Sequence, residues 1–396
     1  SALTMLLPTR LDRYPAKMVS RLADELVKRY ASDASRILDP FCGSCAVLVA
    51  AQRKGISVSG IDLNPLAELF AHVKLHGFSR HRASQLAKNL VTKAGKVKKP
   101  LAVHWSTKRY WFTATTLDKF ERLRAASKGF GLADSDEGMA VLLSWMLSIR
   151  ICSKADQRSP KPFISKQAKV SRKGKHFDPY TTLLRLLNEL SESYGTPTNY
   201  QGSKQFLLAD VASDSSISRK IGKHSHVITS PPYINAQDYF RNFKLEFYLL
   251  EGVLPFSTLG LRDKFIGTER GNLLSGIPKT TVNSHYKMLP PLRKLQRRKP
   301  RLAAVVHRYL HDMGCAFDII KGCLQANARF VLVCGDNLIG GIRICTWQLL
   351  RKMLEQRGFK LFDMFSDKIG DRMLAPKRCG HKGLIKEEVV CAFEMN

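Results

Sequence analysis

The sequence predicts an α/β protein with a doubly wound, mostly parallel sheet. The first observation is the pattern in residues 36–62, where a short strand, a small-residue turn and a helix precede a second strand that ends in Asp62. The second is the apolar run 226–228, which leads into a Thr-Ser-Pro-Pro-Tyr segment at 229–233. Consecutive prolines lack the N–H groups of a sheet ladder, so a buried strand must end there in a rigid turn.

The remaining elements extend this pattern along the chain. Further strands are expected over 205–210, 330–334, 360–365 and 388–394. Helices are expected over 18–27, 46–53, 66–75, 139–151, 180–190, 302–325 and 347–355, and another is expected to begin near 238. Residues 153–175 are expected to form a loop and residues 255–300 an irregular segment. The sheet pattern is absent between 66 and 203, which predicts a helical insertion.

The charge of the chain indicates a polyanionic partner. Lysine and arginine number 64 against 33 acidic residues, which gives a net charge of +31 and a pI near 10.0. Such an excess destabilises a compact state by self-repulsion, so solubility alone does not explain it. Nucleic acid is the favoured partner. A membrane surface is the weaker alternative, because no basic amphipathic helix with a strong apolar face is evident and no apolar run has the length of a bilayer crossing.

The cysteines indicate reduced thiols rather than a metal site. Of the nine cysteines, only Cys42 and Cys45 have the CxxC spacing, and no second pair completes a zinc site. A redox role for this pair is the alternative. We expect no metal and a cytosolic protein.

The two strand-ending turns carry the chemistry. The turn after residue 39 lets the backbone approach a ligand, and Asp62 can accept hydrogen bonds from ribose hydroxyls. Without a GxGxxG pattern or a phosphate-binding lysine, a ribose ligand that lacks pyrophosphate fits better. In the second turn, Ser230 Oγ and the carbonyls of Ser230 and Pro231 can accept hydrogen bonds from an amino group beside the ring of Tyr233. The alternatives are that Asp62 caps a turn and that Tyr233 only packs.

At this point a family resemblance becomes specific. The Asp-Pro-Phe-Cys-Gly-Ser segment 39–44, combined with segment 229–233, resembles the S-adenosylmethionine-dependent amino-methyltransferases of DNA. The Ser-Pro-Pro-Tyr form is most similar to the cytosine-N4 branch. The match covers roughly residues 10–66, 204–246 and 316–394. It implies a seven-stranded class I methyltransferase sheet, S-adenosylmethionine as cofactor and double-stranded DNA as partner.

The resemblance also implies roles for particular residues. The cofactor-binding residues would be Tyr14, Pro15, Ala16, Lys17, Asp39, Pro40, Phe41, Cys42, Gly43, Ser44, Asp62, Leu63 and Asp210. The catalytic residues would be Ser230, Pro231, Pro232 and Tyr233. Tyr233 would stack on a flipped base while Ser230 Oγ and the Pro231 carbonyl accept the hydrogens of its amine.

The basic segments supply the DNA contacts that we expect. Residues 1–66 and 204–396 would form the catalytic domain, 67–203 an inserted helical and basic recognition region, and 255–301 an additional basic recognition segment. The predicted DNA-binding residues are Lys154, Arg158, Lys161, Arg172, Lys173, Arg241, Lys244, Arg297 and Arg298. By resemblance, the protein would be prokaryotic, cytoplasmic and nucleoid-associated, with a cognate restriction endonuclease as a further partner.

Two departures from the family keep alternatives open. Cys45 stands where the family has a further glycine, and the cofactor motif precedes the catalytic one, which is the reverse of many cytosine-N4 enzymes. Pro-Pro-Cys is absent, which counts against methylation at carbon 5 of cytosine. The alternatives are an adenine-N6 DNA methyltransferase, an RNA amino-methyltransferase, and a catalytically silent DNA-binding subunit whose cofactor pocket is spoiled by Cys45.

Overall fold

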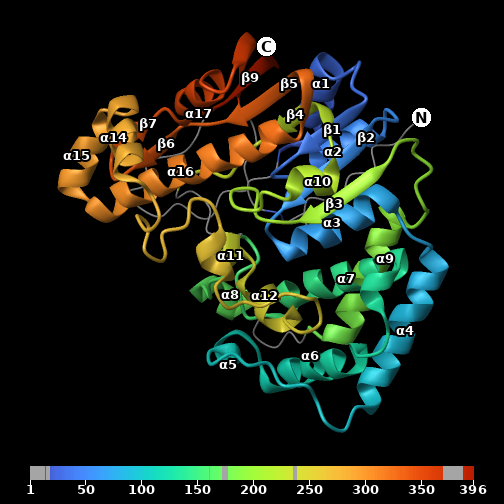
Figure 1. Cartoon of the computed structure of the whole chain (residues 1–396). Coiled ribbons are helices and arrows are strands. Elements are labelled where there is room, and N and C mark those ends of the chain that lie inside the picture. The colour runs from blue at the N-terminus through green and yellow to red at the C-terminus, as the bar shows by residue number, and fades with distance from the viewer. Residues whose placement is uncertain (1–13, 15–17, 160, 172–176, 235–238, 369–386) are drawn as a thin grey trace.

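The computed structural model describes residues 14, 18–159, 161–171, 177–234, 239–368 and 387–396. Within these residues, seven strands form one sheet in the order β3-β2-β1-β4-β5-β9-β8 (Figure 1). The strands are β1 (Arg36–Asp39), β2 (Ser57–Asp62), β3 (Lys204–Leu208), β4 (His224–Thr229), β5 (Leu324–Cys334), β8 (Phe359–Lys368) and β9 (Glu387–Met395). Each neighbouring pair from β3 to β5 is parallel, whereas β9 runs antiparallel to β5 and β8. The predicted doubly wound, mostly parallel, seven-stranded sheet is confirmed.

Helices cover both faces of this sheet. One face packs against α1 (Ser20–Tyr30), α2 (Ala46–Gln52) and part of α3 (Pro65–His76). The other packs against α10 (Ile217–Ile221), α16 (Pro300–Gly322) and α17 (Thr346–Glu355). Because apolar helices lie on both sides, β4 is buried at all but one position and β5 is buried over residues 330–334. The Val, Ile and Phe side chains of these two strands lie in the two clusters.

The helical lobe is the part of the molecule whose apolar side chains form a third cluster, drawn from residues 66–194 and 240–261. Its helices are α4 (Arg80–Lys96), α5 (Lys108–Trp111), α6 (Ala114–Ser127), α7 (Asp136–Cys152), α9 (Pro179–Tyr194), α11 (Tyr239–Asn242) and α12 (Lys244–Leu250). It lies beside the sheet, with α3 between the two (Figure 1). The predicted domain limits stay a prediction, and α11 and α12 pack with the helical lobe although they follow β4 in sequence.

The basic arm consists of α14 (Lys279–Met288) and α15 (Pro291–Arg298), which lie at the start of α16 on the side away from α1 and α2 (Figure 1). Residues 255–300 were expected to be irregular, and this expectation is wrong, since α13 (Leu261–Lys264) also lies there. In α15 only Leu292 and Leu295 are buried, while Arg297 and Arg298 are exposed. Two apolar positions give too weak a period to predict a helix from sequence.

Smaller differences concern element ends. The loop expected over 153–175 contains α8 (Lys166–Ser171). Strand β3 ends at Leu208, two residues before Asp210. A hairpin of β6 (Asn337–Ile339) and β7 (Ile342–Ile344) follows β5 and was not expected. Within the described residues, no helix is both long and apolar enough to cross a bilayer.

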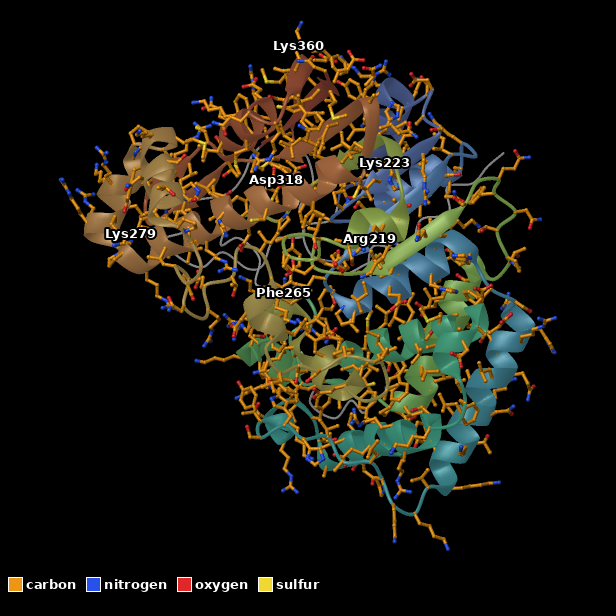
Figure 2. All side chains as sticks on the ribbon, in the orientation of Figure 1. Arg219, Lys223, Phe265, Lys279, Asp318 and Lys360 are labelled. Atoms are coloured by element: carbon orange, nitrogen blue, oxygen red, sulfur yellow. The ribbon has the colours of Figure 1, made fainter. Side chains whose placement is uncertain are left out.

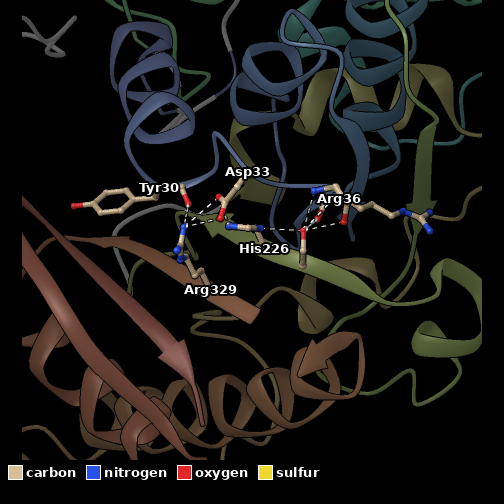
Figure 3. Close-up of polar contacts among 7 residues, drawn as sticks. Tyr30, Asp33, Arg36, His226 and Arg329 are labelled. Carbon is tan, nitrogen blue, oxygen red and sulfur yellow. Dashed lines mark hydrogen bonds and ion pairs between the residues drawn. The ribbon is translucent and has the colours of Figure 1, made fainter. Parts of the chain in front are cut away.

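Side-chain contacts join the amino ends of the central strands (Figure 3). Ser225 Oγ, on β4, accepts hydrogen bonds from the backbone N–H groups of Ser35 and Arg36 at the start of β1. Asp33 forms an ion pair with Arg329 of β5 at 3.1 Å, and its Oδ1 lies 3.6 Å from His226 Nε2 of β4. These contacts hold β1, β4 and β5 together at their amino ends. The candidate site lies at the opposite edge of the sheet, where the strands have their carboxyl ends.

Candidate active site

A cavity of about 830 Å³, part of it open to solvent, lies at the carboxyl ends of β1, β2, β3 and β4. β1 pairs with both β2 and β4, so the strand order reverses at β1. Ligands of open α/β sheets bind at such a switch point. Of the predicted residues, the structure brings together here Tyr14, Asp39, Pro40, Phe41, Cys42, Gly43, Ser44, Asp62, Leu63, Asp210, Ser230 and Pro232.

A direct hydrogen bond joins the two motifs. Thr229 Oγ1, at the end of β4, donates to Asp39 Oδ1 at 2.7 Å. Both residues are buried, and the Phe41 backbone N–H donates to the same carboxylate oxygen at 3.2 Å. Segments that are 190 residues apart in sequence are therefore fixed against each other on one side of the cavity.

Asp62 connects the glycine turn to Tyr14. Its Oδ2 accepts a hydrogen bond from the Gly43 backbone N–H at 2.8 Å and a longer one from the Tyr14 hydroxyl at 3.4 Å. Its Oδ1 accepts from the Asn64 backbone N–H at 2.8 Å, so Asp62 caps a turn as well as lining the cavity. Gly43 has φ +47°, and a Cβ there would lie 2.8 Å from the Tyr14 ring. Only glycine allows this close approach.

The cavity holds two carboxyl groups whose proton affinity is raised. Burial raises the pKa of Asp39 to about 7, and the charge of Asp62 adds to the effect against the hydrogen bonds from Thr229 and Phe41. Burial also raises the pKa of Asp62 to about 6, although hydrogen bonds from Asn64, Gly43 and Tyr14 favour its charged form. Asp210 lines the same cavity. An acidic cavity in a protein of net charge +31 suits a cationic ligand.

Cys45 lies outside the cavity wall. Its φ is +65°, a left-handed conformation that L-residues adopt only at a cost, which explains why glycine suits this position. Its side chain is fully buried in the cluster with α1 and α2, and Cys45 is not among the residues that line the cavity. The thiol therefore does not obstruct the space that a ligand would fill.

The Ser-Pro-Pro-Tyr turn presents only part of itself to the cavity. Ser230 and Pro232 line it, whereas Pro231 and Tyr233 are buried and do not. The Tyr233 hydroxyl donates a hydrogen bond to Glu388 of β9, and its ring lies in the cluster beneath α16. Asn337 Nδ2 donates to the carbonyl of the next residue, Ile234, at 3.1 Å. Contacts from β9 and β6 thus hold the turn from the side opposite the cavity.

Sequence reasoning missed several residues of the site. The cavity is also lined by Met18, Ala46, Val47, Ala209, Val211, Tyr239, Phe265 and Ile266. The aromatic pair Tyr239 and Phe265 carried no local signal, because Phe265 lies in a segment that was expected to be irregular. A second missed contact comes from Lys74, whose Nζ donates to the Ser44 carbonyl at 2.8 Å and so supports the glycine turn.

The predicted DNA-binding residues are not part of the cavity wall. Lys154 and Arg158 are already engaged, by the Arg109 carbonyl at 3.0 Å and by Asp156 respectively. Lys244 Nζ lies 5.3 Å from the centre of the Trp105 ring. Arg241, Arg297 and Arg298 are exposed, and Lys161 is half-buried. Arg172 and Lys173, like the cofactor residues Pro15, Ala16 and Lys17, lie outside the described residues.

The raised pKa of Asp39 predicts a pH-dependent stability. An aspartate in an unfolded chain titrates near 3.9, so between about pH 4 and pH 7 the folded state retains a proton that the unfolded state loses. Folding stability therefore falls as the pH rises through this range. We expect Asp39→Asn, which keeps an acceptor for Thr229, to raise the free energy of unfolding by about 2 kcal/mol more at pH 8 than at pH 5 in urea titrations.

Thr229→Val is the matched variant, since it removes the hydrogen bond that favours the Asp39 carboxylate. It should lose more stability at pH 8 than at pH 5, which is the opposite trend. Equal changes at both pH values for both variants would contradict the role of Asp39.

Sequence comparisons relate part of this chain to methyltransferases. No family model matches the chain. Over 88 residues it is 31% identical to the type II methyltransferase M.MjaII of Methanocaldococcus jannaschii, a match that covers 22% of this chain and 17% of that protein. Over 68 residues it is 35% identical to the type II methyltransferase M.MvaI of Kocuria varians, covering 16% of this chain and 15% of that protein. The matched segments thus span less than a fifth of either relative.

Two solved structures of the rRNA methyltransferase AviRa from Streptomyces viridochromogenes align with this chain. The first aligns over 99% of this chain and 94% of that one, with 13% identity and a TM-score of 0.32. The second covers the same shares at 12% identity and a TM-score of 0.31.

Of the described residues, no group of three or more His, Cys, Asp or Glu is arranged to hold a metal ion. Both sequence relatives are methyltransferases, and the similarity links about a fifth of this chain to them.

Proposed function

We propose that this protein is an S-adenosylmethionine-dependent DNA methyltransferase that transfers a methyl group to the exocyclic N4 amine of a flipped cytosine. The observation that carries the proposal is the shared cavity, which the glycine turn and Asp62 line together with Ser230 and Pro232 of the second turn. Partial similarity to two type II methyltransferases supports it. By the same resemblance, the protein acts in the cytoplasm on double-stranded DNA, with a cognate restriction endonuclease as a further partner.

The residues of the cavity fit the proposed cofactor. S-adenosylmethionine carries positive charges on its sulfonium and ammonium groups and a negative charge on its carboxylate, so it is cationic overall, and it supplies an electrophilic methyl group when bound. Asp39 and Asp62 offer buried carboxyl groups to such a cation. Gly43, where a Cβ would meet Tyr14, lets the backbone approach the ligand closely. Asp62 Oδ2 would exchange its weak 3.4 Å contact with Tyr14 for a ribose hydroxyl.

The second turn supplies the catalytic acceptors. Ser230, which lines the cavity, would accept one hydrogen of the cytosine amine through its Oγ. By the family resemblance the Pro231 carbonyl would accept the other, although Pro231 itself does not line the cavity. Both bonds would draw electron density on nitrogen away from the ring. Fixed acceptors also align the nitrogen for in-line attack, and alignment alone can lower a barrier by several kcal/mol. The turn can act as a rigid template because β4 holds it on one side and Asn337 on the other.

DNA would contact the basic arm. Between Glu269 and Asp312 the sequence contains ten lysine and arginine residues and no acid. On α15, the exposed face carries Arg293, Lys294, Arg297 and Arg298, while Leu292 and Leu295 attach the helix to the core. A helix with one cationic face and one apolar face suits contacts with phosphates, which position the duplex without reading its sequence.

Asp62 is predicted to contribute to cofactor affinity. Asp62→Asn keeps an acceptor but loses the charge, and a charge-assisted hydrogen bond contributes roughly 1.5–3 kcal/mol. We expect the Kd for S-adenosylmethionine in calorimetry to rise about 10- to 100-fold. Asp336→Asn is the control, since Asp336 follows β5 at the same edge of the sheet and is paired with Arg343 instead of lining the cavity. An unchanged Kd for Asp62→Asn would remove Asp62 from the cofactor site.

The protein is predicted to methylate cytosine, with Ser230 contributing to the rate. Incubation with DNA and tritiated S-adenosylmethionine, followed by digestion and mass spectrometry, should yield N4-methylcytosine. Ser230→Ala should lower kcat about 10- to 100-fold without changing the cofactor Kd, because one of the two acceptors for the amine is lost. N6-methyladenine as the product would refute the cytosine assignment while leaving the reaction class intact. A wild-type rate from Ser230→Ala would remove Ser230 from the catalytic roles.

Salt dependence tests the basic arm. Replacing Arg297 and Arg298 with Gln should weaken binding to any duplex and reduce the slope of log K against log salt by about 2, roughly one for each phosphate that the arm no longer neutralises. Lys360→Gln is the control, because Figure 2 places Lys360 on β8 at the end of the molecule away from the helical lobe. Equal slopes for the wild type and the double variant would mean that the arm does not contact DNA.

A further inference from the structure

We propose that a lysine cluster at the end of the helical lobe is a second surface for DNA, separate from the basic arm. The inference takes DNA as the partner from the proposed function, but it does not depend on methyl transfer. It implies that one molecule holds two duplex segments at once. The cluster lies in the last turn of α4, in the segment that follows α4 and at the end of α6, and consists of Lys93, Lys96, Lys98, Lys99 and Lys128.

Positive charge in this part of the chain is not balanced by acids. Between Glu68 and Asp118 the sequence contains ten lysine and arginine residues and no acid, the same balance as in the stretch that forms the basic arm. The next two acids, at 118 and 121 on α6, are paired with Arg122 and Lys108. Within the described residues, none of the five ammonium groups of the cluster forms an ion pair. Their charge is therefore available to an external anion.

Two contacts bring the lysines of α4 and α6 together. Lys93 Nζ donates a hydrogen bond to the Lys128 carbonyl at 3.3 Å. Arg122 of α6 donates to the carbonyl of Val97, which directly precedes two lysines of the cluster. All five lysines are exposed, whereas the buried alanine and leucine side chains of α4 pack in the helical lobe. The ammonium groups thus form one exposed surface on a packed support.

The composition of the cluster suits the phosphate groups of a duplex. Lysine carries a compact point charge, whereas arginine has a planar fork that also matches base edges. A cluster of lysines without arginine therefore suits contacts with the backbone, which do not read sequence. Like charges held close together also repel one another and destabilise the fold. A polyanion that covers them removes this repulsion and releases counterions, which favours binding.

The cluster and the basic arm lie at opposite ends of the molecule. In Figure 1 the arm is at the upper left, while α4 runs along the lower right of the helical lobe and ends at Lys96. A duplex is stiff over about 150 base pairs, so a segment bound at the arm cannot fold back around the lobe to the far end. The cluster is therefore placed for a second segment.

Bridging of two duplexes tests the inference on the full-length protein. One short duplex is fixed to beads, and the retention of a second, fluorescent duplex is measured without S-adenosylmethionine. At about 50 mM salt we expect a quadruple variant of the cluster to lower retention about tenfold or more, and to reduce the slope of log K against log salt by about 3 to 4. Lys93 is kept, because it holds the end of α6. The variant carries Lys96→Gln, Lys98→Gln, Lys99→Gln and Lys128→Gln.

Two control proteins separate the cluster from net charge. The same four positions replaced by arginine keep the charge and should keep bridging. Four exposed lysines spread over the sheet side, replaced by glutamine, change the net charge equally and should also leave bridging within twofold of the wild type. These four are Lys28, Lys54, Lys352 and Lys360. Thermal melts should show no loss of stability in the cluster variant, since it removes charges that repel one another.

A mixing experiment separates one molecule from two. The cluster variant mixed with the Arg297→Gln/Arg298→Gln variant should not bridge, because each molecule keeps only one surface. Restored bridging would mean that self-association joins the duplexes, and would overturn the inference. Wild-type bridging by the cluster variant would overturn it too, and so would an equal loss in methylation of a duplex of about 15 base pairs, which would place the cluster on the substrate segment. A protein that bridges without methylating would refute the proposed function alone, and one that methylates without bridging would refute this inference alone.

Discussion

The hydrogen bond from Thr229 Oγ1 to Asp39 Oδ1 is the contact on which the candidate site depends. It exists because β4 pairs in parallel with β1, which brings the carboxyl ends of both strands to one edge of the sheet. A slip of one residue in this register would turn the two side chains to opposite faces. The contacts of Asp33 and Ser225 at the other end of the sheet oppose such a slip, so the far edge supports the geometry of the cavity.

Two binding sites that we propose, the cavity and the basic arm, carry charges of opposite sign. The chain has an excess of 31 positive charges, yet the cavity contains the carboxyl groups of Asp39, Asp62 and Asp210. Burial makes the carboxyl groups of Asp39 and Asp62 hard to ionise. A cationic ligand would lower this cost, because an opposite charge nearby favours the carboxylate. Acidic residues inside the cavity and basic residues on the arm thus suit ligands of opposite sign.

The aromatic residues of the site come from both halves of the molecule. Tyr233 is held in the core of the sheet side, whereas Tyr239 and Phe265 pack against the helical lobe. Residues from two hydrophobic clusters therefore line the cavity.

The sequence by itself determined the strands of the sheet and most of the cavity wall, because strand ends carry local signals: the proline pair, the glycine turn and the acid at the end of β2. The helices of the basic arm were missed, since only Leu292 and Leu295 mark the buried side of α15. The tertiary structure alone decided which aromatic rings border the cavity. Tyr233 is drawn inward by Glu388 of the distant strand β9, and Phe265 is brought to the cavity by packing against the helical lobe. Contacts between residues so far apart in sequence leave no local pattern, because they depend on how the completed elements pack.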